Sequence, residues 1–246
     1  MSQRFKGGNF EPRLLPEKLL DPLKGKQGGR RIGVCFTGDL FGEWVDPEQE
    51  IGKQVEVWKL IEHRGWIANP DNPLKRIVFE VTKLCPNDTF LFLTKNPAGL
   101  LKWGKFPDNA WIGASVCDQK MLTLAVEYLA LVDAKIKFIS FEPVMKSMGC
   151  VDTVWQELYL GGINWIVIGG WSGGRNTPEI GWIGAIVGAA DFLGTPVFLK
   201  DNLTGKCNRN GLPVDGVLER HNAPWAFKDK GDSGICFRRE FPKEAN

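Results

Sequence analysis

The chain has 246 residues, of which 43% are hydrophobic and 24% are charged, and its formal net charge is +2. These values are ordinary for a soluble globular protein, and the length suits one α/β barrel or one large doubly wound domain. The small net charge gives no indication of a nucleic-acid partner, and no apolar run reaches the length that spans a membrane.

The six cysteines are widely spaced, and no two of them have the CxxC or CxxxC spacing of local zinc or iron–sulfur sites. In a chain with a large apolar core, such spacing favours free thiols in a reducing compartment. The segment Met1–Gly8 has no apolar stretch of the kind found in signal peptides. The sequence therefore predicts a cytoplasmic protein without a metal site.

The predicted elements alternate along the chain. Residues 1–30 are rich in Gly and Pro, which predicts an irregular leader with one short helix at Pro16–Leu23. Short apolar runs then predict strands at Ile32–Phe36, Thr89–Leu93, Ala110–Ala114, Lys137–Phe141, Trp165–Ile168 and Val197–Leu199. Cap residues and helical spacing predict helices beginning at Asp46-Pro47 and Asn72-Pro73, and further helices at Pro97–Trp103, Lys120–Val132, Thr153–Leu160 and Ile180–Leu193. Residues 203–246 predict an irregular C-terminal extension with a hairpin near Gly211–Val217.

The predicted strands are short runs without polar alternation, separated by helices. Such runs suit strands that are buried on both faces, as in a parallel sheet. Right-handed crossovers between them produce an α/β fold. Six strands fall short of the eight that close a standard barrel. We predict a single domain over residues 1–246, built as a parallel, TIM-like partial (β/α) barrel.

Each predicted strand is followed by a small polar cluster. Because ligands bind beyond the carboxyl ends of parallel strands, these clusters predict one active face. Asp39 follows the first strand, where a carboxylate can bind a cation, accept a hydrogen bond from a hydroxyl or act as a base. Lys95 follows the second and suits an anionic group or a Schiff base. Glu142 follows the fourth directly, with Pro143 constraining the exit of the chain.

We predict catalytic roles for Asp39, Lys95 and Glu142, although Asp39 and Lys95 also have a purely structural interpretation. Asp39 can close its own loop through an Asx turn. Lys95 can form a salt bridge with Asp39 or Glu142 at the mouth of the barrel.

A glycine-rich turn, Gly169–Gly174, separates the fifth predicted strand from its helix. Glycines allow backbone N–H groups to approach an anion or a cofactor. The turn lacks the Gly-Lys-Ser/Thr ending of a P-loop. The predicted cofactor-binding residues are those of this turn and two from neighbouring strand ends: Gly169, Gly170, Ser172, Gly173, Ser115 and Lys200.

Six segments of the chain occur in the order found in a known family. They are Asp39-Leu40-Phe41, Leu93–Pro97, Trp111–Val116, Phe141-Glu142-Pro143, Val167–Gly173 and Phe198-Leu199-Lys200. Together they resemble a phage- and bacteria-associated, radical-SAM-like barrel family of unknown function, which is encoded beside three-Cys-motif partner proteins. The resemblance extends from about Phe10 to Asn202 and implies a radical-SAM-like form of the partial barrel.

The resemblance also implies cofactors. Family members carry an N-terminal cysteine motif that holds a [4Fe–4S] cluster, which cleaves S-adenosylmethionine. This chain lacks that motif, and it has Trp171 where the family usually has Glu in a Gly-Gly-Glu-Ser-Gly turn. S-adenosylmethionine and [4Fe–4S] are therefore expected by resemblance only, and the ligands of the cluster are absent from this chain.

We expect a phage-associated, radical-SAM-like barrel, acting on a small-molecule or macromolecular substrate that the sequence does not identify. In this hypothesis the Gly169–Gly174 turn contacts S-adenosylmethionine or the substrate, while Asp39, Lys95 and Glu142 orient the substrate. One alternative is a non-radical lyase or hydrolase on an anionic small molecule, with Glu142 as acid or base and Lys95 with the glycine turn as anion site. The other is a non-catalytic barrel that binds a partner protein.

Overall fold

The centre of the molecule is a six-stranded sheet in which every strand runs parallel to its neighbours. The computed structural model describes residues 14–26, 28–35, 38–51, 73–170, 178–203, 227–229 and 235–243. The strands of the sheet are β1 (Arg31–Val34), β2 (Thr89–Thr94), β3 (Ala110–Val116), β4 (Ile136–Phe141), β5 (Trp165–Ile168) and β6 (Val197–Leu199). They lie side by side in chain order, β1-β2-β3-β4-β5-β6.

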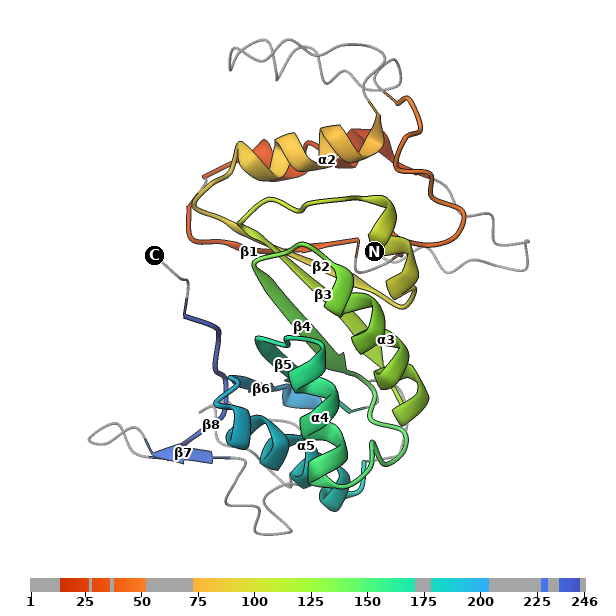
Figure 1. Ribbon diagram of the computed structural model, residues 1–246. Helices are drawn as coiled ribbons and strands as arrows, with labels where there is room; N and C mark the ends of the chain where they lie inside the picture. The colour runs from red at the N-terminus through yellow and green to blue at the C-terminus, as the bar shows by residue number, and fades with distance from the viewer. Residues whose placement is uncertain are drawn as a thin grey trace, which may run out of the picture.

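Helices follow the strands along the chain. The α-helices are α2 (Leu74–Lys83), α3 (Gln119–Leu131), α4 (Val151–Leu160) and α5 (Ile180–Leu193). Short 3-10 helices are η1 (Pro16–Lys18), η2 (Asp21–Leu23), η4 (Pro97–Lys102) and η5 (Asp201–Leu203). The sheet curls into a half-barrel, with α3, α4 and α5 together along one side of it (Figure 1). The predicted α/β partial barrel is therefore confirmed. None of the described helices is long and apolar enough to cross a membrane.

The helix that the sequence predicts from Asp46-Pro47 onward does not begin at these residues. Asp46 and Pro47 form a turn in which the backbone N–H of Glu48 donates to Asp46 Oδ1 at 3.0 Å. Glu50 then makes an isolated β-bridge with Pro73, just before α2. The remainder of that predicted helix, and the predicted hairpin near residues 211–217, lie outside the described residues.

Alternate residues of the strands point to opposite faces of the sheet. Ile112 and Phe141 belong to the main apolar core, which the helices share. The opposite face, which we call the inner face, carries a second apolar cluster. Its buried members are Trp111, Ile136, Phe138, Trp165 and Val167. Both faces are therefore apolar along most of their length, which explains why the strands show no polar alternation in the sequence.

The described part of the predicted irregular extension contains regular structure. Two short antiparallel strands, β7 (Phe227–Asp229) and β8 (Ile235–Phe237), lead into a segment that runs antiparallel along β6. In that segment the N–H of Leu199 donates to the carbonyl of Arg238 at 2.9 Å, and the N–H of Glu240 donates to the carbonyl of Val197 at 3.0 Å. The segment occupies the free edge of β6, which would otherwise present unpaired backbone groups.

Phe241 packs on the inner face of the sheet. Its ring lies 5.3 Å from the rings of Trp165 and of Phe198. The guanidinium of Arg31, on the opposite edge strand β1, lies 3.7 Å from the same ring centre. One side chain of the C-terminal segment therefore contacts residues from both edges of the curled sheet.

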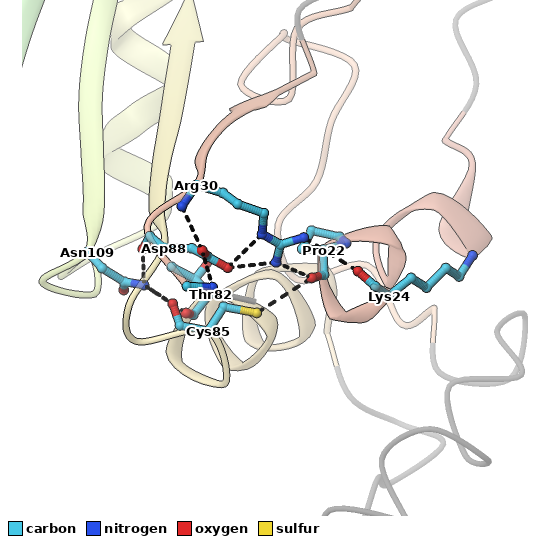
Figure 2. Close-up of polar contacts among 8 residues, drawn as sticks. Pro22, Lys24, Arg30, Thr82, Cys85, Asp88 and Asn109 are labelled. Atoms are coloured by element: carbon cyan, nitrogen blue, oxygen red, sulfur yellow. Dashed lines mark hydrogen bonds and ion pairs between the residues drawn. The ribbon is translucent and has the colours of Figure 1, made fainter. Parts of the chain in front are cut away.

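A buried carboxylate ties the amino ends of the first strands together (Figure 2). Asp88 precedes β2, and its side chain accepts hydrogen bonds from the backbone N–H groups of Gly28 and Arg30, both at 2.9 Å. The Arg30 guanidinium donates to it at 2.6 and 3.1 Å. Bonding to Arg30 lowers the pKa of Asp88 from its ordinary value of 3.8 to about 2. Asn109, before β3, donates to the Asp88 carbonyl at 3.0 Å.

Replacing the carboxylate by an amide tests this junction. We expect Asp88→Asn to lower the free energy of unfolding at pH 7 by about 3 kcal/mol, because it leaves the Arg30 guanidinium without its buried anion. Urea denaturation measures the change, and Asp108→Asn, an exposed neighbour, is expected to change it by less than about 0.5 kcal/mol. Because the folded-state pKa is depressed, the contribution is present above pH 3.8 and is lost as the pH falls through about 2. Equal stability of the variant and the wild type at pH 7 would contradict the assignment.

Candidate functional site

Three of the predicted site residues meet at one edge of the sheet. Glu142, Gly169 and Lys200 directly follow β4, β5 and β6. The register pairs Phe141 with Ile168, and Ile168 with Leu199, so the three strands end at the same level. The parallel sheet therefore places residues from three separate segments side by side.

A carboxylate and an ammonium group form the centre of this edge. Lys200 Nζ donates to Glu142 Oε2 at 2.5 Å, and Asn202 Nδ2 lies 3.4 Å from Glu142 Oε1. The side chain of Glu142 is 21% exposed and that of Lys200 is 41% exposed. The two opposite charges are therefore paired with each other yet remain accessible to a ligand from solvent.

The two glycines after β5 allow close packing. A Cβ atom on Gly169 would lie 2.9 Å from Glu142 Oε1, so a larger residue here would displace the carboxylate from this position. The N–H of Gly170 donates to Asn202 Oδ1 at 3.0 Å, and Asn202 Nδ2 donates back to the Gly170 carbonyl at 2.7 Å. The N–H of Gly170, which the sequence predicts to face an anion or a cofactor, is bonded to Asn202 in this structure. Ser172 and Gly173 lie outside the described residues.

Ser115 and Cys117, at the end of β3, hold the backbone of Glu142. Ser115 Oγ donates to the Glu142 carbonyl at 3.3 Å, and Cys117 Sγ approaches the same oxygen at 3.7 Å. Burial raises the pKa of the Cys117 thiol, the positive charge of Lys95 opposes the shift, and Asp118 and Glu142 add to it. The thiol is therefore mainly protonated at neutral pH and acts as a donor.

Asp39 connects the loop after β1 to the end of β2. Its carboxylate accepts hydrogen bonds from the N–H of Phe41 at 3.0 Å, from Thr94 Oγ1 at 2.8 Å and from the N–H of Lys95 at 2.8 Å. The contact with Phe41 is the Asx turn that the sequence allowed. Asp39 thus positions the backbone of Lys95, whose side chain is exposed at the same edge.

Two residues of the edge were absent from the predicted site. Asn202 lies two residues after Lys200, and Cys117 lies two residues after Ser115. Both follow predicted strand ends, and this position was the feature of the sequence that could have identified them as site residues. Their contacts with Gly170 and Glu142 depend on neighbouring strands and could not be derived from one segment.

The described part of the chain contains no group of three or more His, Cys, Asp or Glu residues that could hold a metal ion. Four free cysteines, Cys35, Cys85, Cys117 and Cys150, lie in separate segments of the chain.

Comparison with known families gives one match. The sequence model of the family described as "Protein of unknown function (DUF5131)" matches residues 2–210. The matched range includes all strands of the half-barrel and every predicted site residue. No curated protein matches the chain.

The environments of two thiols predict different reactivities. Hydrogen bonding with Thr153 lowers the pKa of the exposed Cys150, whereas burial raises that of Cys117. We expect iodoacetamide at pH 7 to modify Cys150 faster than Cys117 by roughly tenfold or more, because the thiolate is the reactive form. Peptide mass spectrometry measures both rates, with urea-unfolded protein as the control. A rise to pH 9 should accelerate Cys117 more than Cys150, and equal folded-state rates would refute the assignment.

Proposed function

The chain belongs to the DUF5131 family of proteins of unknown function, and we propose that it is the barrel portion of a radical-SAM-like enzyme that binds S-adenosylmethionine at the carboxyl ends of its strands. The observation that carries the proposal is the Glu142–Lys200 pair, a partly exposed anion and cation in contact at that edge. The resemblance adds a phage association and a partner protein to the proposal.

The pair has the charges needed to bind an α-amino acid group. S-adenosylmethionine ends in an ammonium and a carboxylate on one carbon atom. The Glu142 carboxylate can accept hydrogen bonds from that ammonium, and the Lys200 ammonium can donate to that carboxylate. On binding, the ion pair within the protein would be replaced by two ion pairs between the protein and the ligand.

The surroundings hold the pair in place before a ligand arrives. Asn202 is fixed by its two hydrogen bonds with Gly170 and approaches the Glu142 carboxylate. Ser115 bonds the Glu142 backbone. Such support reduces the entropy lost when a ligand binds.

The remaining predicted residues surround this centre. Lys95 provides a second cation for the substrate, and Asp39 positions the Lys95 backbone. S-adenosylmethionine, when bound, supplies the reactive sulfonium group, and the protein residues named here bind and orient. The proposal includes no step through an iron–sulfur cluster.

A second function is favoured by the two lysines of the same edge. Lys95 acts electrostatically on Cys117, and Lys200 pairs with Glu142. Two cations suit a substrate that carries a phosphate or carboxylate but no ammonium. In that case the chain would be a non-radical lyase or hydrolase, with Glu142 transferring the proton.

Ligand binding tests the first function. Isothermal titration of the full chain with S-adenosylmethionine should give saturable binding, which Lys200→Met and Glu142→Gln should each weaken about tenfold or more, equivalent to about 1.4 kcal/mol. Methylthioadenosine, which lacks the amino-acid end, should bind at least about tenfold more weakly than S-adenosylmethionine. Lys120→Met, an exposed lysine of α3, is the matched control and should leave binding unchanged.

The two functions differ in their response to Glu142→Gln. An anionic ligand should bind as well or better when this negative charge is removed, whereas the amino-acid end of S-adenosylmethionine should lose a partner. Inorganic phosphate, titrated into the same variants, provides the comparison. Binding of S-adenosylmethionine that neither variant alters, or equal binding of methylthioadenosine, would rule out the proposed mode.

A further inference from the structure

The outer surface of α4 and α5 carries three aromatic side chains, of which Trp155 is half-buried and the other two are largely exposed. Trp155 stacks on Tyr159 with ring centres 5.8 Å apart, and it meets the edge of Phe192 at 5.6 Å. Tyr159 is 66% exposed and Phe192 is 77% exposed. Large apolar side chains that gather on a surface, rather than occurring singly, are typical of binding sites.

The aromatic side chains continue into a longer apolar strip. On α4, Val151, Trp155 and Tyr159 are spaced at i, i+4 and i+8 and share one face of the helix. Val151 packs against α5, where a Cβ atom on Gly188 would lie 3.5 Å from it, and Phe192 follows one turn later. We call these five residues the α4–α5 strip, and its α4 part spans about 12 Å at the helical rise per residue.

The strip lies on two helices whose charged residues are all acidic. The charged residues of α4 and α5 are Asp152, Glu157 and Asp191, and neither helix contains Lys or Arg. Asp191 is paired with Arg238, and Glu157 with the hydroxyl of Thr123. Asp152, next to Val151, is exposed. The charged side chains of both helices are therefore acidic, and Asp152 is the exposed carboxylate next to the strip.

This charge pattern decides between classes of partner. A second copy of the chain, related by a two-fold axis, would place the same acidic helices against each other. Like charges at an interface oppose association, whereas a basic border on the partner would favour it and accelerate encounter. The strip therefore suits a partner of opposite charge rather than itself.

We propose that the α4–α5 strip docks a basic amphipathic helix of a partner protein. Apolar residues of that helix, one turn apart, would pack on Trp155, Tyr159 and Phe192, and its Lys or Arg residues would face Asp152. Aromatic residues are enriched among those that contribute most binding energy at interfaces. The strip is on the helical side of the sheet (Figure 1), whereas the ligand site is at the strand ends, so docking does not depend on the proposed function.

A synthetic helix tests the proposal on the full chain. The probe is a fluorescein-labelled, 14-residue amphipathic peptide of Leu and Lys, and fluorescence anisotropy measures its binding. We expect saturable binding that Tyr159→Ser and Phe192→Ser each weaken about tenfold or more. The same peptide with Glu in place of Lys should bind at least about tenfold more weakly. Leu124→Ser, which changes another exposed apolar residue on α3, is the control and should have no effect.

Several outcomes would overturn the proposal. They are failure of the Lys peptide to bind, equal binding of the Glu peptide, and equal loss of binding in Leu124→Ser. Sedimentation equilibrium of the chain alone tests self-association. A dimer that Phe192→Ser dissociates would assign the strip to a second copy instead.

Discussion

The hydrogen-bond register of β4, β5 and β6 determines where the charged groups of the candidate site lie. Glu142 and Lys200 are far apart in the sequence, and each follows the last residue of its own strand. A shift of one residue in either strand would turn its side chain to the opposite face, because side chains alternate along a strand. The contact between the carboxylate and the ammonium group therefore depends on the sheet, and no local structure of either segment produces it.

Close packing on the inner face maintains that register. Position 113 requires glycine, because a Cβ atom there would lie 2.4 Å from the ring of Phe138. Along the free edge, the C-terminal segment bonds the backbone of β6 on both sides of Phe198. Phe241 then packs between Trp165 and Arg31. This part of the inner face is apolar, and the Glu142–Lys200 pair lies beyond it at the strand ends.

The sequence predicted the type and order of most elements, and it identified Glu142 and Lys200 at strand ends. It did not separate charged groups that stay accessible from those whose hydrogen bonds hold the backbone of another segment. Asp39 and Lys95 are adjacent in the structure, yet the Asp39 carboxylate is occupied by Phe41, Thr94 and the Lys95 backbone. Gly170 likewise donates to Asn202. Such roles depend on partners from other segments, which composition and spacing do not reveal. The turn at Asp46 shows the same limit, because Glu50 pairs with distant Pro73 rather than continuing a helix.

What the sequence determined by itself is the alternation of buried strands and helices, because apolar runs and helical periodicity reflect local burial. It also determined that polar residues follow each strand. Only the tertiary structure decided which of these residues come into contact, that Phe241 packs on the inner face of the sheet, and that Trp155, Tyr159 and Phe192 contact one another. These features join residues that are distant in the chain or on different helices, and their proximity is set by packing between elements rather than by any one segment.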